Sequence, residues 1–184
     1  MRIVGGTYRG RILVAPEGLG VRPTTDRVRE ALFNILEHGD TPLEGARVLD
    51  LFSGSGALGL EALSRGARSV LFVETDADAR GAIRQNVESL GATGATRIFR
   101  RDATQLGSMP GDKGGPFDLI FLDPPYGKGL GVTALASAQD GGWLTGDARI
   151  VFECGADETP DVSGFQLDDM RRYGDTKVLF LRLT

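Results

Sequence analysis

A carboxylate, two prolines and a tyrosine follow one another at Asp123–Tyr126. The apolar run 117–122 before them predicts a buried parallel strand, so these residues would emerge at a strand end where open α/β sheets bind ligands. The prolines remove two N–H donors, and the Pro124 carbonyl and the Asp123 carboxylate could accept both N–H bonds of an amino group. The Tyr126 ring could stack on a displaced base. The pattern indicates methylation of an exocyclic amine, and it is also typical of a plain proline-rich turn.

A second motif, Asp-Leu-Phe-Ser-Gly-Ser-Gly at 50–56, follows the apolar run 46–49. Its glycines would let the backbone pass close under a ligand and open a helix from Ala57 to about Arg65. Residues 54–59 also spell the dinucleotide fingerprint G-x-G-x-x-G, so NAD is an alternative cofactor. Asp50 would repel a pyrophosphate and suits an ammonium or sulfonium group, which favours S-adenosylmethionine.

Glu74 ends a third predicted strand, 69–74, twenty residues after Gly54. A carboxylate at this position can accept hydrogen bonds from both ribose hydroxyls of a cofactor. The alternative is that it begins the helix predicted from about 77 to 90, but Asp76 is better placed as the N-cap. We therefore favour the ribose role for Glu74.

Asp102 follows a fourth predicted strand, 96–100. It could accept a hydrogen bond from the adenine amine of the cofactor. It could instead cap a short helical segment near Thr104. We favour the adenine role and keep the capping role as the alternative.

The composition indicates one compact domain spanning 1–184. The chain is 41% hydrophobic, enough to bury a sheet core without disulfides. No apolar stretch approaches the roughly 20 residues of a membrane span, and the first residues lack a signal peptide's apolar core, so we expect a cytoplasmic protein. The one cysteine, Cys154, lies in the predicted strand around 150–153, where a buried reduced thiol is expected. His38 ends a predicted helix, and the sequence contains no metal-ligand cluster.

Strands and helices alternate from Ala46 to about Glu153, which predicts a parallel sheet with helices on both faces. The last two strands, 164–172 and 176–181, are joined by Tyr-Gly-Asp at 173–175, a tight hairpin signal. An antiparallel strand should therefore close the edge of the sheet. The glycine-rich residues 127–131 predict a mobile segment beside the proposed site.

The first forty residues predict a separate unit on the core 41–184. Apolar runs at 2–4 and 11–14 flank a glycine-rich turn and indicate a small hairpin. A helix should follow from about Thr25. Its apolar face is predicted to consist of Val28, Ala31, Leu32, Ile35 and Leu36.

The N-terminal unit is basic while the chain as a whole is acidic, at −4. Residues 1–30 hold six arginines, at 2, 9, 11, 22, 27 and 29, against three acids. This asymmetry predicts an arm that contacts nucleic acid, although a solvated surface would look the same. The candidate phosphate ligands are Arg9, Arg11, Arg22 and Arg27.

Five runs together resemble the RsmD family of bacterial small-subunit ribosomal RNA methyltransferases, with their order kept over nearly the whole chain. These runs are Arg9–Arg11, Val21–Leu36, Asp50–Gly66, Asp123–Tyr126 and Arg172–Thr176. The resemblance implies a seven-stranded class I methyltransferase fold, a Rossmann-like sheet. It also implies methyl transfer from S-adenosylmethionine to the N2 amine of a guanine in 16S ribosomal RNA.

The resemblance further implies a partly assembled small ribosomal subunit as the substrate, and we expect the enzyme to be a monomer. The guanine would be held by Asp123, Pro124 and Tyr126. The cofactor would be bound by Asp50, Phe52, Gly54, Gly56, Glu74, Asp102 and Ala103.

Other functions are compatible with parts of the sequence. An NAD-dependent oxidoreductase would explain the glycine motif but not the Asp123 turn. A non-catalytic RNA-binding module would leave both motifs without a purpose. Adenine-N6 or another amino group of RNA or DNA could be the target of the same tetrapeptide, but DNA enzymes of this type usually add a recognition domain. Cytosine-C5 chemistry needs a nucleophilic cysteine, and Cys154 is badly placed for it.

Overall fold

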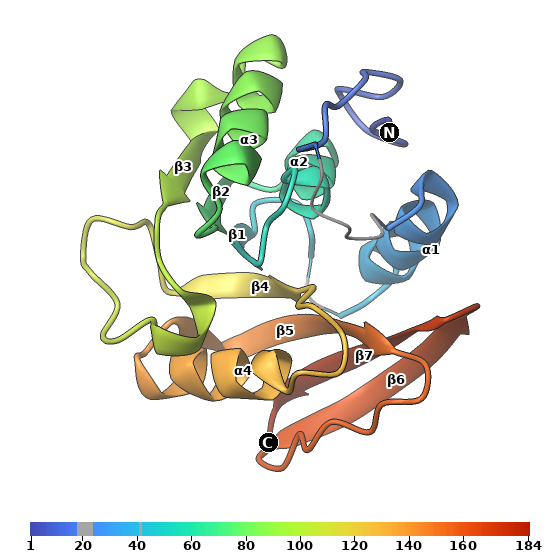
Figure 1. The fold of residues 1–184 in the computed structure, drawn as a ribbon, viewed down its shortest axis with the longest axis vertical. Helices are drawn as coiled ribbons and strands as arrows, with labels where there is room; N and C mark the ends of the chain where they lie inside the picture. Colours follow the sequence, from blue (N-terminus) through green and yellow to red (C-terminus); the bar gives the residue numbers. More distant parts are fainter. Residues whose placement is uncertain (18–23, 41) are drawn as a thin grey trace.

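The computed structural model describes residues 1–17, 24–40 and 42–184. Seven strands form one sheet in the order β3-β2-β1-β4-β5-β7-β6, as Figure 1 shows. The strands are β1 Arg47–Leu51, β2 Ser69–Val73, β3 Thr96–Phe99, β4 Phe117–Leu122, β5 Leu144–Gly155, β6 Phe165–Tyr173 and β7 Thr176–Leu183.

Four α-helices and two short 3-10 helices connect these strands or precede them. They are α1 Asp26–Glu37, α2 Ala57–Ser64, α3 Ala77–Ser89, η1 Thr93–Ala95, η2 Ala103–Gln105 and α4 Leu130–Asp140. Within the described ranges, no helix has the length and apolar character needed to cross a bilayer.

Strands β1 to β5 are mutually parallel, and β1 lies between β2 and β4. The strand order therefore reverses beside β1, which is where open α/β sheets bind ligands. The edge strand β6 pairs antiparallel with β7, and β7 pairs antiparallel with β5, so the predicted antiparallel closure of the edge is confirmed. The strand that opposes all the others is β7, one position inside the edge. The tight turn is also confirmed, with Gly174 at φ +59°.

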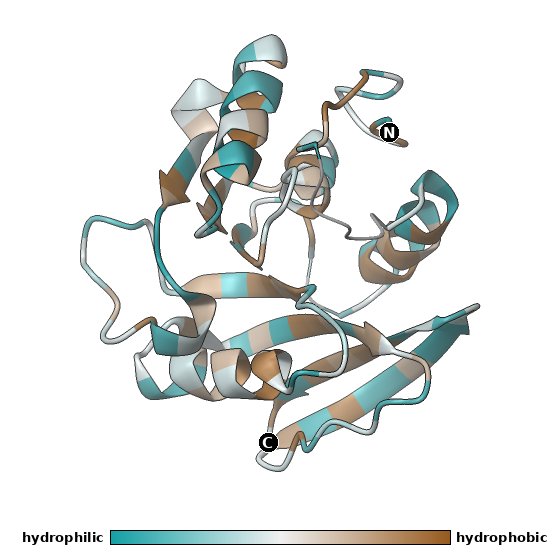
Figure 2. Ribbon diagram, viewed as in Figure 1, coloured by the Kyte–Doolittle hydropathy of each residue, from teal (hydrophilic) through white to brown (hydrophobic). Residues whose placement is uncertain are grey.

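Two apolar layers enclose the sheet because successive strand side chains point to opposite faces. Val48 belongs to the layer beneath α1, α2 and α3, whereas its neighbour Leu49 belongs to the layer beneath α4 and η2. Phe33 of α1 meets Phe121 of β4 with ring centroids 5.6 Å apart. Figure 2 shows the resulting hydrophobic strands at the centre of the fold.

The predicted N-terminal hairpin is present as one antiparallel bridge between Arg2 and Ile12. The predicted helix is confirmed as α1, where the Thr25 hydroxyl accepts a hydrogen bond from the Val28 N–H at 3.2 Å. On its predicted apolar face Leu32 and Leu36 are buried, whereas Val28, Ala31 and Ile35 are partly buried.

Arg29, one of the six arginines of the basic N-terminal residues, is buried in the structure. It is 0% exposed, because its position places it on the same helix face as Leu32, Phe33 and Leu36, which pack on the core. Its guanidinium is compensated by Glu61 of α2, with 3.2 Å between Nε and Oε1. Arg29 therefore anchors α1 and is not available to a nucleic acid.

The segment 127–131 also differs from the sequence prediction. Gly129 caps α4 with φ +67°, and the helix begins at Leu130. The last two residues of the predicted mobile segment are therefore helical.

Candidate active site

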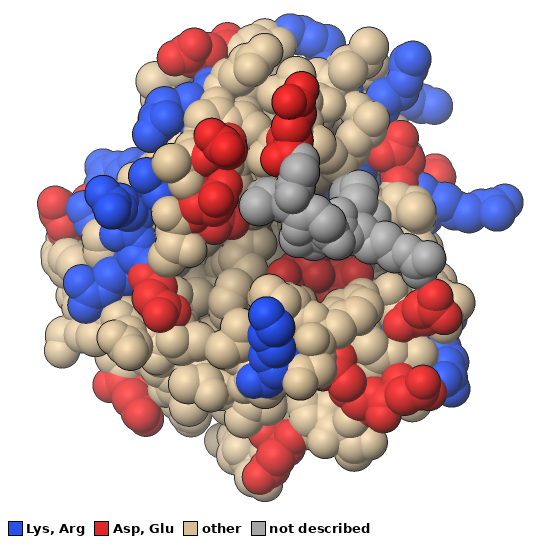
Figure 3. Space-filling view, viewed as in Figure 1, with Lys and Arg blue, Asp and Glu red and all other residues tan. Residues whose placement is uncertain are grey.

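The loops after β1, β2, β3 and β4 meet at one end of the sheet around a cleft of about 650 Å³. Figure 3 looks into a hollow on this face of the molecule. Seven residues predicted from the sequence line this cleft, namely Asp50, Phe52, Gly54, Glu74, Asp102, Ala103 and Asp123. The fold thus gathers residues that are up to 73 positions apart in the chain into one site.

The two glycines of the first loop serve different purposes. Both have left-handed backbone conformations, with φ +57° at Gly54 and φ +82° at Gly56. A Cβ at Gly54 would meet no atom within 4 Å, because that side of the backbone faces the cleft. A Cβ at Gly56 would lie 3.1 Å from the Phe72 ring. Gly54 therefore leaves room for a ligand, whereas Gly56 begins α2 behind the cleft wall.

Phe52 also has a left-handed backbone, at φ +57°, the one non-glycine residue to do so in the described chain. Such a conformation costs about 1–3 kcal/mol and persists where the surroundings impose it, often at ligand sites. Ser53 supplies part of that constraint, since its hydroxyl donates to the Asp50 carbonyl at 2.5 Å and lies 3.2 Å from the Val73 carbonyl.

Glu74 joins two of the loops through its carboxylate. Oε1 accepts from the Gly54 N–H at 2.8 Å, and Oε2 accepts from the Asp76 N–H at 3.0 Å. The cap of α3 is Asp76, whose Oδ2 accepts from the Ala79 N–H at 2.8 Å, as predicted. Each Glu74 oxygen can accept a further hydrogen bond, so this geometry is compatible with ligand hydroxyls.

Asp50 and Asp102 have contrasting surroundings. Asp50 is 1% exposed and its Oδ2 accepts from the Gly59 N–H at 3.1 Å, while burial raises the pKa of its carboxyl well above the ordinary value. Asp102 caps η2, and its Oδ1 accepts from the Thr104 N–H at 2.8 Å and the Thr104 hydroxyl at 2.7 Å. These bonds lower the pKa of Asp102. Asp102 therefore acts as a helix cap, which was the alternative prediction, and the cap uses only its Oδ1 oxygen.

The charge of the cleft discriminates between cofactors. Among the described residues that line it, five are carboxylates and one is an arginine, Arg101. Figure 3 shows acidic side chains beside the hollow, with most lysines and arginines toward the periphery. Such a wall disfavours the two phosphates of NAD and favours a ligand that carries positive charge.

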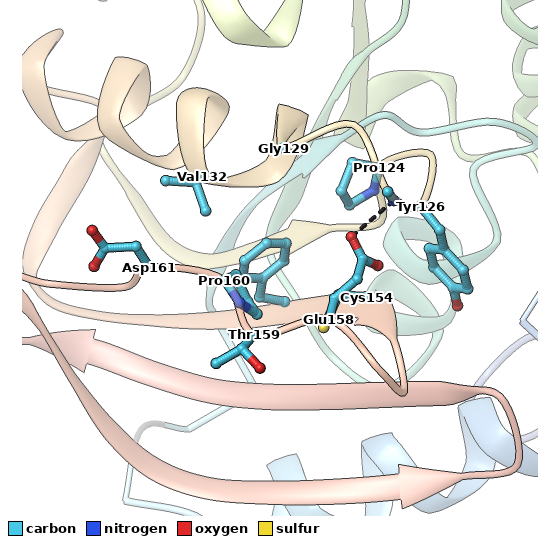
Figure 4. Close-up of a pocket in the computed structure, with 11 residues that line it drawn as sticks. Pro124, Tyr126, Gly129, Val132, Cys154, Glu158, Thr159, Pro160 and Asp161 are labelled. Carbon is cyan, nitrogen blue, oxygen red and sulfur yellow. Dashed lines mark hydrogen bonds between the residues drawn. The ribbon is translucent and has the colours of Figure 1, made fainter.

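The predicted tetrapeptide separates this cleft from a second cavity of about 380 Å³. Asp123 and Pro125 line the first, whereas Pro124 and Tyr126 line the second together with Cys154 and Glu158. Figure 4 shows this second cavity between the start of α4 and the loop after β5. The turn is held in place by Glu158, whose Oε1 accepts from the Gly127 N–H at 2.8 Å. Cys154 is buried, and burial raises the pKa of its thiol, which fits the predicted structural role.

Glu153 is a residue of this site that the sequence prediction missed. It lies near the end of β5, is 5% exposed, and its carboxyl group interacts with that of Asp123. Its Oε1 accepts from the Tyr126 hydroxyl at 3.2 Å, and that hydroxyl lies 2.9 Å from the Thr176 hydroxyl. Burial and the Glu153 carboxylate raise the pKa of Asp123 well above its ordinary value. The available signal was a lone acid in an apolar strand next to β4.

The N-terminal arm borders the cleft through Met1, Ala15 and Pro16. Arg9, Arg11 and Arg27 are exposed, and the Arg11 guanidinium donates to the Ser89 carbonyl. Arg22 lies outside the described residues. In the described part of the chain, no three His, Cys, Asp or Glu residues are arranged to hold a metal ion.

Known proteins resemble this chain in sequence and in structure. The family model described as "Conserved hypothetical protein 95" matches residues 1–182. Ribosomal RNA small subunit methyltransferase D of Escherichia coli K12 is 42% identical over 83% of this chain and 74% of its own length. The protein of the same name from Haemophilus influenzae is 35% identical, over 86% and 80% respectively. The solved structure of yhhF from Escherichia coli, described as a candidate methyltransferase, has a TM-score of 0.82 at 35% identity and covers 100% of this chain and 97% of its own.

Proposed function

Since this chain belongs to the RsmD family, we propose that it transfers a methyl group from S-adenosylmethionine to the exocyclic N2 amine of a guanine in small-subunit ribosomal RNA. Family membership and the class I methyltransferase fold confirm what the sequence predicted. The observation that carries the proposal is the convergence of the Gly54 loop, Glu74 and Asp123 on one acidic cleft.

The residues of the cleft fit S-adenosylmethionine. Glu74 would offer carboxylate acceptors to the ribose hydroxyls, Asp102 would accept from the adenine amine, and Gly54 leaves the space that a Cβ would fill. The acidic lining suits a ligand with a sulfonium and an ammonium group, above all through the carboxylates of Glu74, Asp76 and Asp102. When bound, the cofactor supplies an electrophilic methyl group. The same acidic wall argues against an NAD-dependent oxidoreductase.

The protein's own residues prepare the amine. An aromatic exocyclic amine is a poor nucleophile because its lone pair is delocalised into the ring. Asp123 and the Pro124 carbonyl would accept hydrogen bonds from its two N–H groups and hold the lone pair toward the methyl carbon. This positioning would supply most of the acceleration. The N–C bond forms as the C–S bond breaks, and one amine proton leaves, passing to the Asp123 carboxylate or to solvent. Tyr126 contributes its ring as a stacking surface, and its hydroxyl is occupied by Glu153 and Thr176.

The RNA partner would be recognised by the basic arm beside the cleft. Exposed Arg9, Arg11 and Arg27 would contact phosphates, and Arg22 completes the predicted set. The chain as a whole carries −4, so naked RNA should bind weakly. We therefore propose that a partly assembled small subunit is the substrate, met by a monomeric enzyme in the cytoplasm.

The direct test is nucleoside mass spectrometry after incubation with labelled S-adenosylmethionine and small-subunit particles from cells that lack the protein. The expected product is N2-methylguanine in 16S ribosomal RNA. Tyr126→Phe should keep much of this activity and Tyr126→Ala should lose it, since stacking needs only the ring. Label in N6-methyladenine would support the alternative amino target, and label in DNA or protein would contradict an RNA substrate.

A further inference from the structure

Glu153 connects three parts of the chain that the proposed mechanism treats separately. Its Oε2 accepts from the Thr24 hydroxyl at 2.9 Å and its Oε1 from the Tyr126 hydroxyl at 3.2 Å, while its carboxyl group also interacts with that of Asp123. Thr24 lies two residues before α1, and its carbonyl accepts from Nη1 of the buried Arg29 at 3.3 Å. Glu153 therefore joins the catalytic turn to the N-terminal unit.

In the described part of the chain, the ionisable groups that interact with Glu153 are acidic or neutral. The turn after β4 presents Asp123 and Tyr126, and β5 itself presents Cys154. The neighbouring lysine of β7, Lys177, donates to the backbone carbonyl of Glu158 instead. No described cation forms an ion pair with Glu153. Burying a carboxylate costs stability unless its partners compensate it, and the described partners of Glu153 are hydroxyl groups of the catalytic turn and the N-terminal unit.

We propose that Glu153 is a positioning residue for methyl transfer, which fixes Asp123 and Tyr126 in the orientation that receives the guanine amine and ties that orientation to Thr24. The inference rests on the proposed function. A carboxylate suits this task because both of its oxygens accept, so that it can bind two hydroxyl groups and still interact with Asp123. An amide has only one acceptor oxygen, because its other terminal group is an NH2 donor. Glu153 also acts more strongly than Asp50 on the pKa of Asp123.

The test compares Glu153→Ala, Glu153→Gln and wild type in single-turnover methylation of small-subunit particles. Glu153→Ala should lower the rate constant by about 100-fold, the scale of losing one positioned polar group, with the dissociation constant of S-adenosylmethionine unchanged within about threefold. Glu153→Gln should retain more activity, because its amide oxygen still accepts from Tyr126 or Thr24. It should also move the acidic limb of the pH–rate profile to lower pH, because Asp123 loses a neighbouring negative charge and gives up its proton more readily.

A merely structural residue would slow the reaction without moving that limb. Asp118→Asn is the matched control, since Asp118 lies at the opposite end of the same strand as Asp123, where its Oδ2 accepts from the Arg47 N–H at 2.9 Å. Its pH–rate profile should coincide with that of wild type. Circular dichroism and cofactor binding confirm that each variant is folded.

These measurements distinguish failure of the proposed function from failure of the positioning role of Glu153. If wild-type protein makes no N2-methylguanine, the proposed function fails. If wild type is active and Glu153→Ala has a normal rate constant, or Glu153→Gln leaves the acidic limb in place, the positioning role of Glu153 is wrong and the proposed function stands.

Discussion

The side chains of Arg29 and Glu61 are both completely buried, with 3.2 Å between Nε and Oε1. Glu61 also accepts the N–H groups of Val4 at 2.9 Å and Gly5 at 3.0 Å, and its Oε2 lies 2.9 Å from Nε of Arg65. One carboxylate thus connects the N-terminal arm, α1 and α2. The arm that borders the cleft is held by this buried charge as well as by apolar packing.

Removal of this carboxylate should be costly. We expect Glu61→Ala to lower the free energy of unfolding by about 3–5 kcal/mol, because it removes the buried partner of the Arg29 guanidinium, leaving the half-exposed Asp26, and leaves the N–H groups of Val4 and Gly5 without an acceptor. Urea denaturation measures the change. Glu37→Ala is the control, since Glu37 pairs with the same Arg65 at 3.2 Å but is 41% exposed, and it should cost at most about 1 kcal/mol. Equal effects of the two substitutions would contradict the anchoring role.

Glu74→Ala should weaken the binding of S-adenosylmethionine by about 1.5–3 kcal/mol, the scale of hydrogen bonds to a charged group. The loss has two sources, since the carboxylate would bind ribose and also holds the Gly54 loop. Isothermal titration calorimetry measures the affinity, and NAD serves as the competing ligand. Asp78→Ala removes an exposed acid in the first turn of α3, outside the cleft, and should leave the affinity unchanged. Tight NAD binding without S-adenosylmethionine binding would defeat the methyltransferase proposal.

Asp123→Asn should lower the rate of methyl transfer and raise the stability of the folded protein. We expect methyl transfer to fall strongly, because the amide keeps one acceptor oxygen but has no negative charge and cannot take the amine proton, while cofactor affinity stays within about threefold because this role is directed at the amine. The raised pKa of Asp123 means that the folded protein holds this proton more tightly than the unfolded chain does. The stability that the folded protein gains from this proton is fully present below the pKa of Asp123 in the unfolded chain. It is lost as pH rises through the pKa of Asp123 in the folded protein.

The variant should therefore unfold at a higher temperature than wild type at pH 9, and this advantage should shrink toward pH 4. Thermal unfolding followed by circular dichroism at several pH values measures it. An advantage that is constant with pH would show that Asp123 does not carry the shifted pKa.

Neutralising the exposed arm should affect RNA binding alone. The triple variant Arg9→Gln, Arg11→Gln and Arg27→Gln should reduce the slope of log affinity against log salt by about 2–3, with each phosphate contact worth about 0.7–0.9. Binding of small-subunit particles at several salt concentrations measures the slope. Arg171→Gln on β6 removes an exposed arginine elsewhere, and its slope should match wild type. A normal slope in the triple variant would remove the arm from the RNA interface.

Much of the fold could be predicted because the strands are local apolar runs with clear ends. Phe117–Leu122 coincides with β4, Asp76 caps α3 as predicted, and α1 begins directly after Thr25. The burial of Arg29 could not be predicted, because whether a guanidinium on an amphipathic helix is buried depends on a partner 32 residues away. Glu153 was missed for a similar reason, since its importance arises only when β5 lies beside β4. The roles of Glu74, Asp102 and Asp123 stay predictions.

The position of β7 has a consequence for synthesis from the amino terminus. Strand β6 pairs with β7 alone, and β7 also covers the open side of β5, yet β7 follows both in the chain. A nascent chain that ends before Thr176 would expose two unpaired strand edges, and such edges recruit other chains. It would also lack the Thr176 hydroxyl that helps to orient Tyr126. Synthesis of β7 therefore covers the open edge of β5 and completes the hydrogen bonds of the catalytic turn in the same step.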